Sequence, residues 1–403
     1  MKFNRNCDVM TGEFSSRSFC SDHGVSARGM KILLVNNDKG WGGGQQHLLL
    51  LAEELRRLGC FPHFLCRGKS PSAKIFASRG FPVWPLWGAG SGILRSVRAS
   101  AALLRQERFD VVLVAREHDL IRTVVARKLA HPIRKQGRVV MSFHTATRKR
   151  HYFLGSVDAV VCVSSYIQDK LRAFNKKIAV PLTVIGNGIP FTNEPDDEKF
   201  SLQRKRRYFP TAGFPLIGMV GAFFKNQVEL IDCIPLLKQA FPEIKVALVG
   251  DDSDPGLTGP ILDRARQLGV TDSLFFTGSV QHERISDVYF DLDVSVSTFR
   301  NEGFGLVHLE SLAAGTPVVA YDEGGQVDIF RSSDAGILVS GGPKKFAAAV
   351  TGLLQNHERR FAMGRAGFRL LQSKWTVQEM GRKYYDLFKC LADCRSPGQG
   401  ADL

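Results

Sequence analysis

Short runs of β-branched and aliphatic residues alternate with amphipathic stretches along the chain from Met30 onwards. Each apolar run has the length of a buried strand, and the stretches between them repeat their apolar positions every three to four residues, as helices do. Strict alternation of strand and helix is typical of parallel sheets with helices on both faces. The pattern therefore predicts an α/β protein.

The alternation runs through the chain twice. The first series has expected strands over 32–36, 62–66, 82–85, 111–115, 139–142, 159–163 and 182–185, with helices over 45–58, 72–78, 91–106, 120–129 and 165–172. The second has strands over 216–220, 245–249, 274–277, 294–297 and 317–320, with helices over 227–239, 260–268, 283–290 and 306–314. Two doubly wound parallel sheets facing each other would place the carboxyl ends of their strands at a shared cleft.

Charge, proline and glycine mark the expected domain boundaries. An N-terminal domain is predicted over 30–190, a linker with a solvated RKRR run over 191–213, and a C-terminal domain over 214–375. Residues 376–403 are expected to form a helix that packs back, with Thr376 as its N-cap, followed by a tail. Residues 1–29 lack hydrophobic periodicity, and we interpret them as a disordered leader or as sequence upstream of a true start at Met30.

Composition narrows the class of protein. A chain of 403 residues exceeds the usual size of one hydrophobic core, so two domains are expected. Eight scattered cysteines do not resemble a disulfide framework and favour a reducing compartment. The longest apolar runs are far shorter than the ~20 residues that cross a bilayer. These features predict a cytoplasmic protein.

The net charge of +15 is concentrated in the first half of the chain. Residues 30–190 contain 26 Lys and Arg against 9 Asp and Glu, a net charge of +17, whereas residues 191–403 contain 24 against 27, a net charge of −3. A domain this basic is expected to face an anionic partner, which could be nucleic acid, an acidic membrane leaflet or a phosphorylated acceptor.

Two glycine-rich turns are candidate phosphate sites. Gly42, Gly43 and Gly44 lie between the first strand and its helix, where backbone N–H groups and a helix N-terminus can approach a phosphate. Their spacing matches no dinucleotide or Walker fingerprint, and a tight turn without ligand is the alternative. The second turn, Gly303-Phe304-Gly305, lies between Glu302 and Glu310. A carboxylate in this setting can accept both hydroxyls of a vicinal diol; the alternative is two unrelated helix-face glutamates.

The segment from Asn301 to Ala320 resembles the E-x7-E motif of the retaining GT-B glycosyltransferases, in particular glycosyltransferase family 4 (group 1). The resemblance extends over nearly the whole chain from Met30 and includes the SFHT run at 142–145, the FTG run at 276–278 and the GTPVVA run at 315–320. It implies two Rossmann-like domains and sugar transfer from a nucleotide diphosphate sugar. It further implies retention of anomeric configuration and no metal or other cofactor, as in bacterial lipopolysaccharide-core and cell-envelope sugar transferases. A UDP-sugar is the expected donor.

The resemblance also implies roles for individual residues. Glu310 corresponds to the acid that bonds the ribose of the donor, and His144 to an active-site histidine of the first domain. Glu302 and the loop amides after it are expected to meet the donor sugar and phosphates; these amides belong to Phe304, Gly305 and Leu306. Lys225 is the remaining cation of the family's diphosphate clamp.

The sequence departs from the family pattern at the partner of Lys225. The usual Arg of the clamp is Ala222, and Arg300, Arg284 or a residue of the first domain could substitute for it. If none does, loss of a charged hydrogen bond of roughly 1.5–3 kcal/mol would slow transfer by one or two orders of magnitude. A non-catalytic binder of sugar nucleotides is the alternative that Ala222 favours. Lesser departures are Gln45 and Asp328, where Glu is usual. The acids Asp291 and Asp293 match a D-x-D metal motif only superficially, and Cys390 and Cys394 lack a second ligand pair, so no metal site is predicted.

The acceptor is expected to lie against the basic first domain. Its predicted acceptor or membrane side consists of Arg122, Arg127, Lys128, Arg134, Lys135, Arg148, Lys149 and Arg150, with Arg138 nearby. This surface suits a lipid-linked acceptor and predicts peripheral association with the cytoplasmic face of the inner membrane. A capsule or exopolysaccharide glycan is the alternative acceptor, and nucleic acid is not favoured. The sequence leaves the oligomeric state open.

Overall fold

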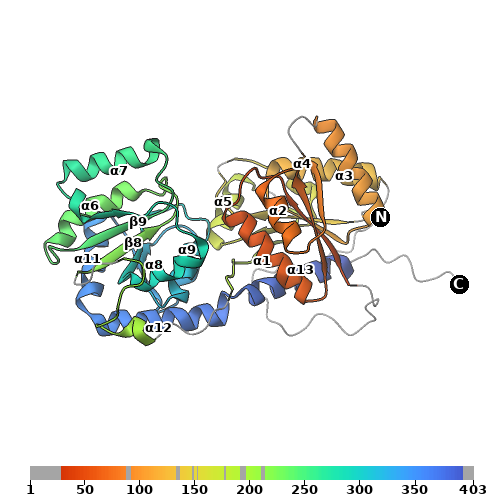
Figure 1. Cartoon of the computed structure of the whole chain (residues 1–403). Coiled ribbons are helices and arrows are strands. Elements are labelled where there is room, and N and C mark those ends of the chain that lie inside the picture. The colour runs from red at the N-terminus through yellow and green to blue at the C-terminus, as the bar shows by residue number, and fades with distance from the viewer. Residues whose placement is uncertain are drawn as a thin grey trace.

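The computed structural model describes residues 29–87, 92–132, 137–147, 149–151, 153–176, 178–190, 197–209 and 214–393. It contains two α/β domains side by side, with the C-terminal helix α13 (Val377–Asp393) passing from the second domain along the first (Figure 1). The predicted leader and tail lie outside the described residues, apart from Gly29.

The N-terminal domain has a seven-stranded parallel sheet in the order β3-β2-β1-β4-β5-β6-β7. The chain builds outward from β1 in one direction and then from β4 in the other, so the topological switch point lies between β1 and β4. Its elements are β1 (Lys31–Asn36), α1 (Gly43–Arg57), β2 (Phe61–Arg67), α2 (Pro71–Ser78), β3 (Val83–Trp87), α3 (Ile93–Glu107), β4 (Val111–Val114), α4 (Glu117–Ala130), β5 (Arg138–Phe143), η1 (Leu154–Ser156), β6 (Ala159–Cys162), α5 (Ser165–Phe174) and β7 (Leu182–Val184).

The C-terminal domain repeats this arrangement with six parallel strands in the order β10-β9-β8-β11-β12-β13, and its switch point lies between β8 and β11. Its elements are η2 (Asp197–Phe200), β8 (Leu216–Val220), α6 (Gln227–Lys238), β9 (Lys245–Val249), α7 (Pro255–Gln267), η3 (Thr271–Ser273), β10 (Leu274–Phe276), η4 (His282–Arg284), α8 (Ile285–Asp291), β11 (Val294–Ser297), α9 (Leu306–Ala313), β12 (Val318–Tyr321), α10 (Val327–Phe330), β13 (Gly336–Val339), α11 (Pro343–Gln355) and α12 (His357–Lys374). The predicted architecture of two doubly wound Rossmann-like domains is confirmed.

The central strands are apolar throughout because helices cover both faces of each sheet. All four residues of β4 are buried, as are all four of β12. Such strands lose the alternation of polar and apolar positions that one-sided sheets keep. The continuous apolar runs of the sequence follow from this burial.

Some element boundaries differ from the sequence predictions. Helix α7 begins at Pro255 and not at Pro260, because Asp254 caps it by accepting a hydrogen bond from the Gly256 amide at 2.8 Å. Four elements between 321 and 376 were not expected: α10, β13, α11 and α12. Strand β13 is a four-residue run at the sheet edge, too short for its periodicity to show.

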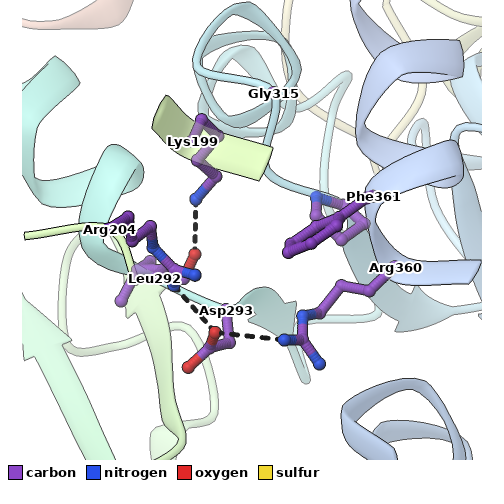
Figure 2. Close-up of a pocket in the computed structure, with 8 residues that line it drawn as sticks. Lys199, Arg204, Leu292, Asp293, Gly315, Arg360 and Phe361 are labelled. Atoms are coloured by element: carbon purple, nitrogen blue, oxygen red, sulfur yellow. Dashed lines mark hydrogen bonds and ion pairs between the residues drawn. The ribbon is translucent and has the colours of Figure 1, made fainter. Parts of the chain in front are cut away.

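Residues 197–209 pack tightly onto the C-terminal domain (Figure 2). The Lys199 ammonium is buried and donates to the backbone carbonyls of Tyr289, Phe290 and Leu292 at 2.6–3.1 Å, where it caps the end of α8. Arg204 donates to Asp293 at 2.7 Å, and only a space of about 10 Å³ remains beside them. The prediction that residues 204–207 are solvated is therefore wrong for Arg204, because its guanidinium pairs with the buried carboxylate of Asp293.

The chain crosses between the domains at two adjoining points. Ile189 and Thr376 form a parallel bridge, in which the Ile189 amide donates to Trp375 and the Val377 amide donates back to Ile189. Thr376 accepts a hydrogen bond from the Glu379 amide at 3.2 Å, which confirms the predicted N-cap of α13. Helix α13 then packs against α1, where Gly381 leaves room for the side chain of Glu54 (Figure 1).

Candidate functional site

An ion pair occupies the switch point of the C-terminal sheet. Lys225 follows β8 and Glu302 follows β11, and the Lys225 Nζ to Glu302 Oε2 distance is 2.6 Å. The two side chains are only 19% and 13% exposed. Gly221 has φ +138°, which lets the loop turn back so that the stem of Lys225 passes beside it. Two residues 77 positions apart thus meet where ligands bind in open α/β sheets.

The two glutamates of the motif have opposite electrostatic settings. Burial alone would raise the pKa of Glu302, but Lys225 and the Gly303 amide outweigh it, so this pKa lies below its usual value. Burial raises the pKa of Glu310, and contributions from His282, Tyr289 and Lys225 do not compensate. The Tyr289 hydroxyl donates to Glu310 at 3.3 Å. Lys225 therefore acts on both carboxylates but reverses the effect of burial at only one.

The glycine loop before α9 brings the two domains together. A Cβ atom on Gly303 would lie 2.2 Å from the carbonyl oxygen of His144, so only glycine fits at this approach. Gly305 has φ +106° and forms the N-cap of α9. The Phe304 side chain is buried, with its ring centroid 5.2 Å from that of Trp375. Only the backbone of Phe304 is thus available for the predicted donor contact.

The N-terminus of α1 faces the same place. A Cβ atom on Gly43 would lie 3.8 Å from Leu306, the first residue of α9. A Cβ atom on Gly44 would touch nothing within 4 Å, so this glycine faces open space. The first amides of a helix have no carbonyl partner within it. The N-termini of α1 and α9, each with positive partial charge, therefore lie against each other.

His144 lies at the end of β5 within a buried polar chain. Its Nε2 is 3.0 Å from the Ser142 hydroxyl, which is 3.3 Å from the Tyr384 hydroxyl of α13. The His47 ring of α1 packs edge-on against His144, with ring centroids 4.6 Å apart. Burial lowers the pKa of His144 to about 4, so its imidazole is neutral at pH 7. The C-terminal helix thus supports the predicted active-site histidine.

A cavity of about 640 Å³ opens at the switch point of the N-terminal sheet. Asp38, which follows β1, pairs with Arg116, which follows β4. Glu117 pairs with Lys149, and its carboxylate is 3.1 Å from His151 Nδ1. Sequence reasoning missed Asp38, Arg116 and Glu117, although each lies just after a predicted strand, which is the position that could have identified them.

The proposed substitutes for the missing Arg have other partners. Ala222 is exposed beside Lys225. Arg300 donates two hydrogen bonds to Glu229 and lies over the Tyr321 ring. Arg284 pairs with Asp287 at 2.7 Å. Neither guanidinium is directed at the Lys225 and Glu302 pair by these contacts.

The two lesser departures have structural roles. Gln45 donates to Asp38 and to Asn36 beside the cavity. Asp328 accepts a hydrogen bond from the Ser165 amide at 2.6 Å and so ties α10 to the N-terminal domain. Asp328 and Gln45, which stand where Glu is usual, therefore both have hydrogen-bond partners in this structure.

The predicted basic side of the N-terminal domain is only partly a surface. Arg127 is buried, donating to Asp158 at 2.6 Å and to the Ser156 carbonyl at 2.7 Å, so its assignment to an acceptor or membrane surface is wrong. A buried carboxylate holds it inside the domain. Lys128 and Arg150 are exposed, Arg122 is half-buried, and Lys149 lines the cavity. Arg134, Lys135 and Arg148 lie outside the described residues.

The acids of the apparent D-x-D motif hold the interdomain segment. Asp291 accepts hydrogen bonds from the amides of Arg207, Tyr208 and Phe209, and Asp293 from Arg204 and the Leu216 amide. Within the part of the chain that the structure describes, no group of three or more His, Cys, Asp or Glu has metal-binding geometry.

Among the described helices, none has the length and apolarity needed to cross a bilayer.

Two family models match consecutive segments of the chain. Residues 41–192 match Glycosyltransferase Family 4, and residues 202–369 match Glycosyl transferases group 1. The first match ends and the second begins within the interdomain segment 191–213, and Lys225, Glu302 and Glu310 lie within the second.

Curated relatives share sequence with the chain. It is 41% identical over 120 residues to D-inositol 3-phosphate glycosyltransferase 2 of Catenulispora acidiphila, covering 29% of this chain and 28% of that protein. It is 34% identical to the D-inositol 3-phosphate glycosyltransferase of Corynebacterium kroppenstedtii, over 40% of this chain and 38% of that protein. These matches span well under half the length of either relative. A longer match, 27% identical, covers 83% of this chain and 90% of the phosphatidyl-myo-inositol mannosyltransferase of Mycobacterium tuberculosis.

Solved structures share the fold over nearly the whole chain. A glycosyltransferase of Rickettsia africae superposes with a TM-score of 0.76 at 18% identity, covering 90% of this chain and 98% of that one. HepE of Anabaena with UDP-glucose gives 0.73 at 17% identity, covering 90% and 100%. The lipopolysaccharide outer core galactosyltransferase WaaB gives 0.68 at 16% identity, covering 90% and 100%. With both family models matched in order on this fold, the chain belongs to the GT-B glycosyltransferases of family 4, group 1.

Proposed function

We propose that the protein transfers a sugar from a nucleotide diphosphate sugar to a cell-envelope acceptor, with retention of anomeric configuration and without a metal ion. The observation that carries this proposal is the Lys225–Glu302 ion pair at the β8/β11 switch point, with Glu310 buried nearby on α9. A cation and two helix N-termini are suited to a diphosphate, and a buried carboxylate is suited to ribose hydroxyls.

In this mechanism the bond between the sugar C1 and the diphosphate oxygen breaks, and negative charge grows on the departing diphosphate. Lys225 and the N-terminal amides of α9 stabilise that charge where it develops. The acceptor hydroxyl attacks C1 from the face that the diphosphate leaves. Its proton passes to a diphosphate oxygen, so no protein base is required. A neutral His144 would then hydrogen-bond the donor sugar, since its pKa of about 4 makes it a poor proton acceptor at pH 7.

The donor is expected to be a UDP-sugar, which is supported by the UDP-glucose complex of HepE. A lipid-linked envelope acceptor is supported by the names of two relatives, the phosphatidyl-myo-inositol mannosyltransferase and the lipopolysaccharide galactosyltransferase WaaB. A capsule or exopolysaccharide glycan is the second candidate.

A peripheral position at the cytoplasmic face of the membrane would suit a lipid-linked acceptor. Helix α4 exposes Val125, Lys128 and Leu129 on one face, and the neighbouring α3 exposes Ile93 and Leu94 at its start. Apolar side chains next to cations bind anionic interfaces through burial and charge together. This surface is the proposed contact with the membrane.

The test is a donor screen. We expect one among UDP-glucose, UDP-galactose, UDP-N-acetylglucosamine, GDP-mannose and ADP-glucose to bind by calorimetry and to release its sugar slowly to water. EDTA should leave that rate unchanged, and NMR of the transferred sugar should show the anomeric configuration of the donor. Binding without release would identify a non-catalytic binder, and failure of every nucleotide to bind would refute the assignment.

A further inference from the structure

The Glu229 carboxylate, on the first turn of α6, accepts hydrogen bonds from residues at the ends of three strands. Arg300, which follows β11, donates from both terminal nitrogens at 2.5 and 2.9 Å. The Tyr321 hydroxyl at the end of β12 donates at 2.6 Å, and the Asn226 side chain in the loop after β8 donates at 2.5 Å. Strands β8, β11 and β12 are neighbours in the sheet. One carboxylate therefore joins three adjacent strand ends.

Two of these donors stand next to the ion pair of the candidate site. Asn226 directly follows Lys225, and Arg300 precedes Glu302 by two positions. A second link joins the same two loops, because the Thr298 hydroxyl donates to the carbonyl of Asn226 at 2.8 Å. The loops after β8 and β11 are thus connected by contacts that lie outside the ion pair itself.

The loop after β8 needs such support at Asn226. This residue has φ +64°, in the left-handed region that residues other than glycine seldom adopt and that asparagine tolerates best. It forms the N-cap of α6, but its side chain makes no capping hydrogen bond to the helix. Its amide group donates to Glu229 instead. That bond fixes the turn by which the chain passes from Lys225 into α6.

The network around Glu229 is charged and largely shielded from water. The side chain of Glu229 is 15% exposed and that of Arg300 is 28% exposed. Burial acts to raise the pKa of Glu229, but hydrogen bonds from Arg300, Tyr321 and Asn226 outweigh it, so this pKa lies below its usual value. Arg300 also pairs with Glu323 at 2.9 Å. A bidentate pair between ionised groups holds its geometry more firmly than neutral hydrogen bonds do.

We propose that Glu229 is a positioning residue of the transfer reaction, which holds the loops after β8 and β11 so that Lys225 and Glu302 stay paired to receive the diphosphate. It acts through Asn226 and Arg300 and not by contact with the donor. The identity of the reaction rests on the proposed function.

The kinetic test is Glu229→Gln, alone and combined with Lys225→Ala. The single change should lower kcat by about ten- to hundredfold, because a small displacement of a group that acts on the reacting atoms has an effect of this size. In the Lys225→Ala background the same change should lower kcat by no more than about twofold, since the cation that it positions is gone. A loss of folded protein would instead lower kcat by the same factor in both backgrounds.

Asp232→Asn is the matched control for this series. Asp232 lies one turn further along α6 and pairs with Arg264 of α7 at 2.6 Å, away from the loops after β8 and β11. This change should leave kcat unaltered.

A second measurement needs no turnover. Carboxyl NMR titration of Glu302, assigned with Glu302→Gln, should show a higher pKa in Glu229→Gln, because Lys225 then lies less closely against a buried carboxylate. Loss of the Glu229 charge by itself would lower the pKa of Glu302, since a like charge nearby disfavours ionisation. If Glu229→Gln does not fold, Tyr321→Phe removes one hydrogen bond and keeps the charge. It should change kcat and this pKa in the same directions by smaller amounts.

An unchanged kcat, equal losses of kcat in both backgrounds, or an unchanged or lowered pKa of Glu302 would overturn the inference. A raised kcat would also overturn it, by showing that Arg300, once released, serves the diphosphate. Turnover by the unaltered protein reports separately on the proposed function. Turnover with equal losses in both backgrounds defeats the inference alone. A raised pKa of Glu302 in a protein that turns over no donor defeats the proposed function alone.

Discussion

The two domains place an ion pair at the same topological position but at different depths. Lys225 and Glu302 at the β8/β11 switch point are 19% and 13% exposed, whereas Arg116 and Asp38 at the β1/β4 switch point are 49% and 28% exposed. Water screens the second pair and raises its effective dielectric, so its worth is small. The first pair acts in a drier setting and can respond strongly to charge on a ligand. One topology therefore yields a nearly buried ion pair in one domain and a water-screened ion pair in the other.

A second contrast lies within the C-terminal side. Glu302 and Glu310 are both buried, yet the pKa of Glu302 is lowered and that of Glu310 is raised. The difference arises because Lys225 bonds one carboxylate directly and acts on the other only through space. Burial acts to raise the pKa of both acids, and only the directly bonded cation at Glu302 reverses that effect.

The strongest challenge to the buried pair is removal of its cation. Lys225→Ala should lower kcat by about 10²–10³-fold, the scale seen when one stabilising donor of a transition-state charge is lost. Steady-state kinetics with the donor found in the screen will check this. Lys238→Ala, which removes an outer cation paired with Asp272, is the control and should leave kcat unchanged. A near-normal kcat for Lys225→Ala would show that another cation balances the diphosphate.

The contrast between the two glutamates can be sharpened with Glu310→Gln. Loss of a charged acceptor for the ribose should weaken nucleotide binding by about 1.5–3 kcal/mol in calorimetry. The pKa of Glu310 is higher in the folded protein than in the unfolded chain. The wild-type protein therefore loses stability as the pH rises from the pKa of Glu310 in the unfolded chain through its pKa in the folded protein. The melting temperature of Glu310→Gln should therefore exceed that of the wild type at neutral pH. The two melting temperatures should be equal at acid pH. The exposed Glu283→Gln should change neither quantity, and unchanged nucleotide affinity in Glu310→Gln would contradict its role.

The exposed side of the N-terminal domain can be tested with vesicles. Changing Lys128 and Arg150 together to Gln should weaken binding to anionic vesicles by about 2 kcal/mol, at about 1 kcal/mol for each cation near the surface. Binding should also fade as salt rises, because exposed charges are screened over about 8 Å at physiological ionic strength. Lys344 and Lys345, exposed on the other domain, provide the matched double control. Equal sedimentation with neutral and anionic lipid would argue for a soluble glycan acceptor.

The smallest expected effect concerns the support of His144 by the C-terminal helix. Tyr384→Phe removes the hydroxyl next to Ser142. The activation free energy should rise by about 0.5–1.5 kcal/mol, the usual contribution of one neutral hydrogen bond, and kcat should fall accordingly. KM for the donor should change little, because Tyr384 acts through Ser142 and His144. Tyr385→Phe, one residue along the same helix, is the control. An altered KM with an unchanged kcat would show a different role.

Much of the fold could be predicted because strands and helices follow local patterns. The buried strands β4 and β12 are apolar throughout, and their runs are visible without any partner. Helices with clear caps were also placed closely, as the hydrogen bond from Glu379 to Thr376 shows for α13. Helix α7 begins five residues before its predicted start, because Pro260 lies inside the helix and not at its first turn.

The sequence by itself determined the two-domain α/β architecture and, through the motif, pointed to Lys225, Glu302 and Glu310. Only the tertiary structure decided that Arg127 is buried against Asp158, that Asp38 meets Arg116, and that Tyr384 reaches Ser142. These residues are separated by 31, 78 and 242 positions. Periodicity reports which face of an element is apolar, but it holds no information on which distant charge that face will meet. Whether a cation is buried or exposed depends on that partner, since desolvation is tolerated only where a carboxylate or carbonyl compensates for it.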